Sequence, residues 1–212
     1  RTTTYLILGA FIVQSLVFAL IINTPDFYQT TTGDVYAESG VLPDEARHFN
    51  NIKFYSSSSL LNGPNIETAG EDTLFLGVVE TFPSYLYYYI ASLFTKILYQ
   101  SGLEDIHVYI ALRFITIVLS FVVLLIVRYL CRIVKLSLAQ ENLVLLGIVF
   151  TGAFSWMSSA ISYDIPSLLL FLLVVSMCLQ YLQTRRVGYV YLSFLFTLLL
   201  GVTKYTYIPT AG

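Results

Sequence analysis

Residues 107–130 read HVYIALRFITIVLSFVVLLIVRYL, an apolar run of 24 residues. Its formal charges are confined to Arg113 and Arg128, and most of the remaining residues are apolar. A helix of this length, rising 1.5 Å per residue, exceeds the ~30 Å hydrocarbon core of a bilayer. The stretch His107–Leu130 therefore predicts a membrane-spanning helix.

Similar runs recur along the chain, which has 212 residues, of which 57% are hydrophobic and 11% are charged. Soluble domains carry about 25% charged residues, so the composition indicates an all-α integral membrane protein built as a polytopic helical bundle. Four further spans are predicted: Tyr5–Ile22, Asn142–Ser159, Ile165–Gln183 and Tyr189–Ile208. Cys131 and Cys178 fall at or inside spans, so no disulfide is expected.

One more run, Phe82–Gln100, is rich in tyrosine and contains Lys96, so it resembles an interfacial helix as much as a membrane span. The positive-inside rule favours the interfacial interpretation. With five spans and this run not crossing, one side of the membrane carries the loop cations Arg128, Arg132, Lys135, Arg185 and Arg186. The other side, predicted to be extracytoplasmic, carries Asp44, Asp164 and Lys204.

These runs divide the chain into three parts. Residues 1–23 are the first transmembrane helix, which we expect to be a retained anchor. Residues 24–106 form an external loop with interfacial helices at about 44–61 and 82–100, and Phe49, Ile52 and Phe54 are expected to rest on the bilayer. Residues 107–212 hold four further transmembrane helices. The chain is expected to be part of a longer protein.

The external loop carries the first candidate site, at residues 43–49, which read PDEARHF. Asp44 and His48 are four residues apart and share one face of a helix. A carboxylate beside an imidazole at a membrane surface accepts a proton or holds a divalent metal. The alternative is that Asp44 and Glu45 are solvated acids in a first helical turn, where they complement the helix dipole.

Other ionisable residues lie near the same predicted membrane face. Asp164 begins a span, either as an N-terminal cap or as a site residue. Lys204 ends a span, either snorkelling to the interface or contacting a phosphate. Arg113 lies inside a span, where cations are costly and usually paired, so it is a phosphate or ion-pair candidate. Glu80 is a weaker candidate. The sequence contains no glycine-rich phosphate loop, nucleophile elbow or CxxC motif, and nothing suggests a nucleic-acid partner.

The order of these motifs resembles the membrane-embedded GT-C glycosyltransferases, in particular their N-terminal part in the protein-mannosyltransferase-like and aminoarabinose-transferase-like groups and related bacterial and archaeal membrane families. The motifs that carry the resemblance are Pro43-Asp44-Glu45-Ala46-Arg47-His48-Phe49, Phe82-Pro83-Ser84-Tyr85-Leu86-Tyr87-Tyr88, Leu112-Arg113-Phe114, Ser162-Tyr163-Asp164 and Gly201-Val202-Thr203-Lys204. Where many relatives have a His- or Lys-Pro-Pro-like sequence, this chain reads Glu80-Thr81-Phe82-Pro83.

The resemblance implies a glycosyltransferase of the prokaryotic plasma membrane and cell envelope, with its active site on the extracytoplasmic face. Such enzymes move a sugar from a polyprenyl-phosphate carrier to an acceptor glycan, lipid or protein, usually with inversion. Asp44 or Glu45 would be the catalytic base. The residues implied to bind the substrate or its lipid phosphate are Arg47, His48, Arg113, Asp164 and Lys204, and the candidate metal ligands for a divalent ion are Glu80 and His48.

Two other classes of function remain open at this point. A transporter or flippase fragment would have ionisable residues and broken helices near the middle of the bilayer. A non-catalytic membrane scaffold would tolerate loss of Asp44 and Asp164.

Overall fold

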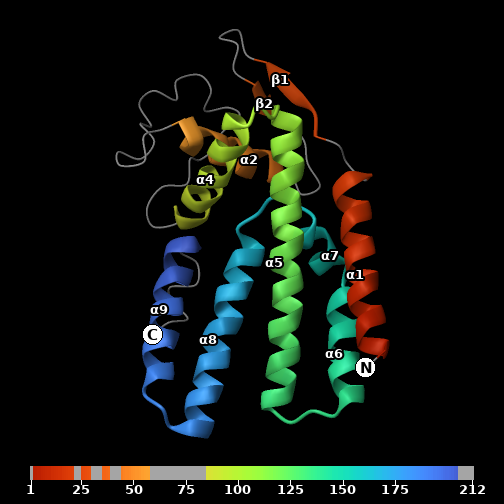
Figure 1. Ribbon diagram of the computed structural model, residues 1–212, viewed down its shortest axis with the longest axis vertical. Coiled ribbons are helices and arrows are strands. Elements are labelled where there is room, and N and C mark those ends of the chain that lie inside the picture. The colour runs from red at the N-terminus through yellow and green to blue at the C-terminus, as the bar shows by residue number, and fades with distance from the viewer. Residues whose placement is uncertain (1, 22–24, 30–34, 39–43, 58–84, 205–212) are drawn as a thin grey trace.

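The computed structural model of the protein describes residues 2–21, 25–29, 35–38, 44–57 and 85–204. In this part of the chain, apolar helices form a bundle, and a layer of shorter elements covers one end of it (Figure 1). The bundle consists of α1 (Thr2–Leu20), α5 (Asp105–Ile133), α6 (Leu138–Val149), α7 (Gly152–Ser158), α8 (Asp164–Thr184) and α9 (Gly188–Thr203). The covering layer, here named the cap, consists of β1 (Phe27–Gln29), β2 (Val35–Ala37), α2 (Glu45–Ser57) and α4 (Leu86–Gln100).

Among the described residues, α1, α5 and α8 are long and apolar enough to cross a membrane, and the bent pair α6–α7 adds a fourth candidate if it forms one span. Helix α9 is apolar but shorter, and the span predicted over 189–208 extends beyond the described residues. Large apolar side chains such as Val13, Val118 and Leu143 are exposed on the helices. Exposed apolar surface of this kind suits contact with lipid, so the bundle is consistent with a membrane location.

The prediction of one continuous helix over 142–159 is wrong, because α6 and α7 meet at a 69° bend. At the bend, Thr151 Oγ1 donates a hydrogen bond to the carbonyl of Gly147. Ser155 Oγ donates to the carbonyl of Val149. Hydroxyl groups that bond to nearby carbonyls compete with the helical ladder and bend helices, which accounts for the break.

The cap is built on a short antiparallel ribbon, an exception to the all-helical expectation, in which Phe27 of β1 lies opposite Ala37 of β2. Asn50 of α2 holds this ribbon: its Nδ2 donates to the Ala37 carbonyl at 2.9 Å, and its Oδ1 accepts from the Ala37 N–H at 2.8 Å. Phe49 and Ile52 are fully buried in the apolar core of the cap. The expectation that these two side chains rest on the bilayer is therefore wrong.

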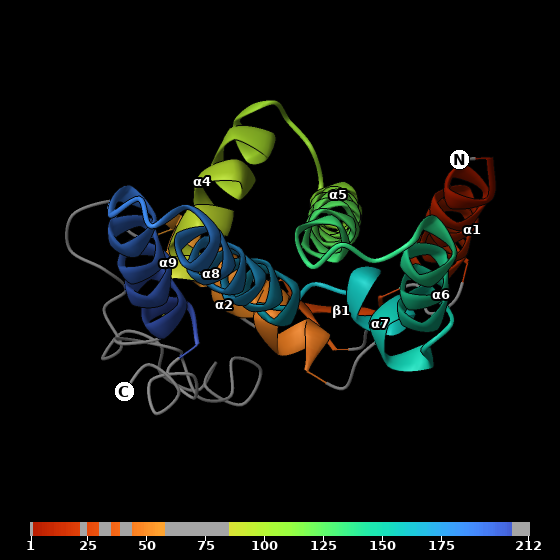
Figure 2. The same cartoon turned by 90° about the horizontal axis from the view of Figure 1, so that it is seen from below.

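Helix α5 is the centre of the bundle and contacts α1, α4, α6, α7 and α8. Viewed from the end opposite the cap, α8 and α9 lie on one side of α5, and α1, α6 and α7 lie on the other (Figure 2). Because successive helices run in opposite directions, the beginnings of α5 and α8 and the end of α9 all lie beside the cap (Figure 1).

The charged residues sort to the two ends of the bundle as predicted. The end of α5 and the turn between α8 and α9 lie away from the cap, with the cations Arg128, Arg132, Lys135, Arg185 and Arg186 (Figure 1). Asp164 begins α8 and Lys204 follows α9 at the cap end. Which end faces the cytoplasm stays a prediction.

Candidate functional site

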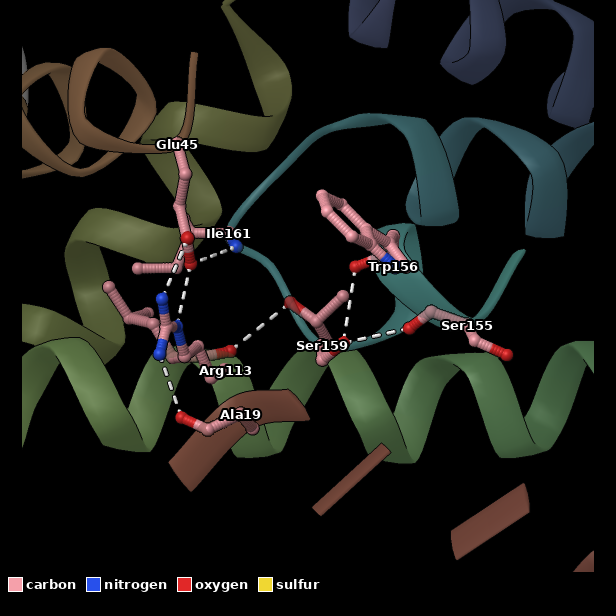
Figure 3. Close-up of polar contacts among 9 residues, drawn as sticks. Ala19, Glu45, Arg113, Ser155, Trp156, Ser159 and Ile161 are labelled. Carbon is pink, nitrogen blue, oxygen red and sulfur yellow. Dashed lines mark hydrogen bonds and ion pairs between the residues drawn. The ribbon is translucent and has the colours of Figure 1, made fainter. Parts of the chain in front are cut away.

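A buried ion pair between Glu45 of α2 and Arg113 of α5 anchors the candidate site. Arg113 Nε and Nη2 donate to Oε1 and Oε2 of Glu45, each at 2.8 Å. Arg113 Nη1 donates to the Ala19 carbonyl at 2.7 Å, and Glu45 Oε1 accepts from the backbone N–H of Ile161 at 2.9 Å (Figure 3). This arrangement, here named the Glu45–Arg113 node, joins α1, α2, α5 and the segment before α8.

The node forms because two helix ends leave backbone groups without helical partners. Helix α1 ends at Leu20, so the Ala19 carbonyl is among the last carbonyls that no intrahelical N–H reaches. Helix α7 ends at Ser158, so the N–H of Ile161 lies outside any helix. A guanidinium and a carboxylate satisfy both backbone groups and neutralise each other, which makes burial of the charges tolerable.

The node changes the roles expected of two predicted site residues. The side chains of Arg113 and Glu45 are only 1% and 0% exposed. Glu45 is therefore poorly placed to accept a proton from a substrate, and Arg113 is poorly placed to contact a lipid phosphate. The ion-pair alternative holds for Arg113, and the exposed Asp44 is left as the candidate base.

One turn further along α2, His48 is buried against tyrosine rings. Its Nδ1 lies 2.7 Å from the hydroxyl of Tyr88 in α4. The Tyr163 ring meets the imidazole edge to face, with ring centres 4.8 Å apart. Burial, followed by the charge of Arg47, lowers the pKa of His48 to about 4, while the charges of Asp44 and Asp164 oppose the shift. The imidazole is therefore neutral at pH 7.

Asp164 and Lys204 form an ion pair where α8 begins and α9 ends. Lys204 Nζ donates to Asp164 Oδ1 at 2.5 Å and lies 4.9 Å from the centre of the Tyr163 ring. Ser162 Oγ donates to Asp164 Oδ2 at 2.9 Å and orients the carboxylate. The two side chains are 27% and 29% exposed, so this pair, unlike the Glu45–Arg113 node, is accessible to a ligand.

The predicted site residues thus fall into two groups. One group is the buried pair of Glu45 and Arg113. The other group surrounds His48, because the imidazole feels the charges of Asp44, Arg47, Asp164 and Lys204. Glu80 lies outside the described residues. Within the described ranges, no group of three His, Cys, Asp or Glu side chains is placed to hold a metal ion.

Tyr88 and Tyr163 are site residues that the sequence analysis did not single out. The run of tyrosines over residues 85–89 is visible in the sequence, but its helical register against α2 is not. Only packing shows that Tyr88, rather than a neighbour, reaches His48.

An apolar cavity of about 390 Å³ lies between α4, α5, α8 and α9. Its lining includes Pro166 and Thr203, which are close in sequence to Asp164 and Lys204, and Tyr87 of α4. Burial, then the charges of Glu45 and Asp164, raise the pKa of Tyr87, so its hydroxyl stays protonated. Because the remaining lining is almost entirely aliphatic and aromatic, the cavity suits a hydrocarbon chain with a polar head at the Asp164–Lys204 pair.

Comparisons with known proteins identify no relative: no protein-family model, no curated protein and no solved structure matches this chain. The class that the fold itself defines is a helical protein with apolar helices long enough to span a membrane, capped at one end by a small layer of shorter helices and strands.

Proposed function

We propose that the protein is a GT-C-type glycosyltransferase that moves a sugar from a polyprenyl-phosphate carrier to an acceptor hydroxyl on the extracytoplasmic face of the membrane. The observation that carries this proposal is that an exposed acid and a neutral imidazole lie near the Asp164–Lys204 pair, which itself adjoins an apolar cavity. The motif resemblance described above supports the same class of enzyme.

The reaction would be a direct displacement at the anomeric carbon. Asp44 takes the proton of the acceptor hydroxyl as its oxygen forms the new bond to that carbon. The bond between the anomeric carbon and the phosphate oxygen breaks, and its electron pair leaves with the lipid phosphate. Lys204 stabilises the negative charge that develops on this leaving group, which is usually the largest contribution to catalysis of this kind.

The apolar cavity supplies the other half of substrate recognition. A chain of isoprene units gains about 0.8 kcal/mol for each buried CH₂-sized group. The cavity lies next to Thr203, so a chain held there brings its phosphate towards Lys204. Arg47 is half-buried on α2, and its charge adds to the positive potential near His48.

A transporter or flippase of the same lipid is the second candidate. The 69° bend between α6 and α7 favours it, because transporters often bind their cargo at broken helices. Against it, Asp164 and Lys204 lie at helix ends, while transport sites gather ionisable residues at mid-depth. A non-catalytic scaffold gives no role to an accessible ion pair beside the cavity.

The test is release of polyprenyl phosphate from a panel of polyprenyl-phosphate sugars by the full-length protein in nanodiscs. Replacing Asp44 with Asn should lower the rate by about 10²–10⁴-fold, as expected for loss of a general base. Glu38→Gln is the matched control, since Glu38 is an exposed acid of the cap next to the ribbon. Full transfer by Asp44→Asn would overturn the catalytic assignment, and lipid movement without transfer would favour the flippase.

A further inference from the structure

The hydrogen-bonding state of His48 carries an inference beyond the reaction class. The imidazole is 3% exposed and Tyr88 is fully buried, so water does not replace the contact between them. In the described part of the chain, the single hydrogen bond of the imidazole is the one between Nδ1 and the Tyr88 hydroxyl. Nε2 makes no hydrogen bond in this part of the chain, and it is not among the fully buried polar atoms there. This nitrogen therefore retains access to its surroundings.

The chemistry of the pair decides where its protons lie. A neutral imidazole carries one proton, either on Nδ1 or on Nε2. A phenol is a stronger acid than an imidazole N–H, and an unprotonated imidazole nitrogen is a stronger base than a phenol oxygen. The Tyr88 hydroxyl therefore donates to Nδ1, which leaves the imidazole proton on Nε2.

The surroundings show what that proton can reach. The imidazole and Lys204 Nζ lie against the same Tyr163 ring, at 4.8 Å and 4.9 Å from its centre. The charge of Lys204 also acts on the imidazole, so an anionic group seated beside Lys204 lies in the same site as His48. The charged groups around the imidazole are Asp44 and Arg47 from α2, Asp164 from α8, and Lys204.

We infer that Tyr88 fixes His48 in the Nε2–H tautomer, and that Nε2–H donates a hydrogen bond to an oxygen of the phosphate that Lys204 binds. This inference rests on the proposed function for the identity of the phosphate, which belongs to the lipid carrier. Tyr88 is then a positioning residue that acts through His48. A neutral donor orients the phosphate without adding a second positive charge beside Lys204.

Nitrogen-15 NMR of histidine-labelled protein tests both halves of the inference, because the chain has two histidines. His107 is exposed at the start of α5 and serves as the internal control. Wild-type protein in nanodiscs should show His48 as a single Nε2–H tautomer. Tyr88→Phe should populate both tautomers of His48 and leave His107 unchanged. A wild-type signal from the Nδ1–H tautomer would overturn the inference.

Ligand titrations test the contact to phosphate. Undecaprenyl phosphate should shift the Nε2 signal of His48, whereas undecaprenol, which has the chain without the phosphate, should not. A shift of equal affinity with inorganic phosphate would mean that the site takes free phosphate, which would overturn the assignment to the lipid. No response of His48 to either phosphate would overturn the contact itself.

Variants separate positioning from folding. Tyr88→Phe should weaken undecaprenyl phosphate binding by about three- to tenfold, the value of one neutral hydrogen bond. His48→Gln keeps an N–H donor and should bind better than His48→Leu; equal binding by the two would contradict the inference. The NMR readout does not require turnover, so a responsive His48 without sugar transfer would refute the proposed function alone, and transfer with a silent His48 would refute this inference alone.

Discussion

Replacing Glu45 with Gln should be among the most destabilising single changes in the cap. The side chain keeps its size and can still accept from the N–H of Ile161, but Arg113 loses its counter-charge. The structure gives two charge-assisted hydrogen bonds of 2.8 Å between the partners. At about 1.5–3 kcal/mol each, they account for the ~3–5 kcal/mol that breaking a buried ion pair costs.

The single tryptophan of this chain provides the assay. Trp156 lies in α7, shortly before the segment that reaches Glu45 (Figure 3). Its fluorescence during unfolding in nanodiscs should show a fall in Tm of about 10 °C for Glu45→Gln, given roughly 2–4 °C per kcal/mol at this chain length. Arg132→Gln is the control, because Arg132 is 57% exposed in its ion pair with Glu141, which keeps Arg128 as a partner, so this change should cost about 1 kcal/mol or less.

A double-mutant cycle completes the test. Glu45→Gln combined with Arg113→Gln removes both charges and should cost at least about 2 kcal/mol less than the sum of the single changes. If Glu45→Gln unfolds within about 1 kcal/mol of wild type, or if the two changes are simply additive, then the buried pair is not what joins these four parts of the chain.

Three further predictions concern the cap and the cavity. The pKa of His48 is about 4 in the folded protein, against 6.5 in the unfolded chain. The contribution of His48 to stability is therefore complete above pH 6.5 and falls by up to ~3 kcal/mol as the pH drops through 4. Acid titration of unfolding should show this loss in the wild type but not in His48→Gln. Asn50→Ala leaves the backbone groups of Ala37 without its amide and should cost about 2 kcal/mol, with faster hydrogen exchange at the ribbon; unchanged exchange would contradict this. Ala91→Phe adds a ring to the cavity lining and should weaken binding of undecaprenyl phosphate but not of inorganic phosphate, and equal losses for both would argue that the chain lies elsewhere.

Much of the bundle could be predicted from hydropathy alone. The spans expected over 107–130 and 165–183 correspond to α5 and α8; α5 extends two residues further at its start and three at its end, and α8 one residue further at each end. Hydropathy works here because a helix in lipid must satisfy its backbone internally and expose apolar side chains. The bend at Thr151 could not be predicted, since Ser, Thr and Gly are also compatible with a continuous apolar helix.

The site could be predicted in outline but not in its roles. Asp164 and Lys204 were expected at one end of the bundle because helix direction alternates along the chain, and the structure brings them into contact. Asp44 and Glu45 are adjacent acids with equivalent local signals. Which of them is buried depends on where Arg113 lies, and that is decided by tertiary packing. The partnership of Tyr88 with His48 has the same origin, since it depends on how α4 packs on α2.

The positions of the acid and the base in the Glu45–Arg113 node cannot be interchanged. Its carboxylate faces a backbone N–H, and its guanidinium faces a backbone C=O, and neither backbone group can exchange donor for acceptor. Exchanging the two side chains would set a guanidinium against the N–H of Ile161 and a carboxylate against the carbonyl of Ala19. Charge reversal, which restores many exposed ion pairs, should therefore fail here. A continuous helix through Ile161 would also remove this contact, because the N–H of Ile161 would then bond within the helix. The attachment of the cap therefore depends on the interruption between α7 and α8 as much as on the charges.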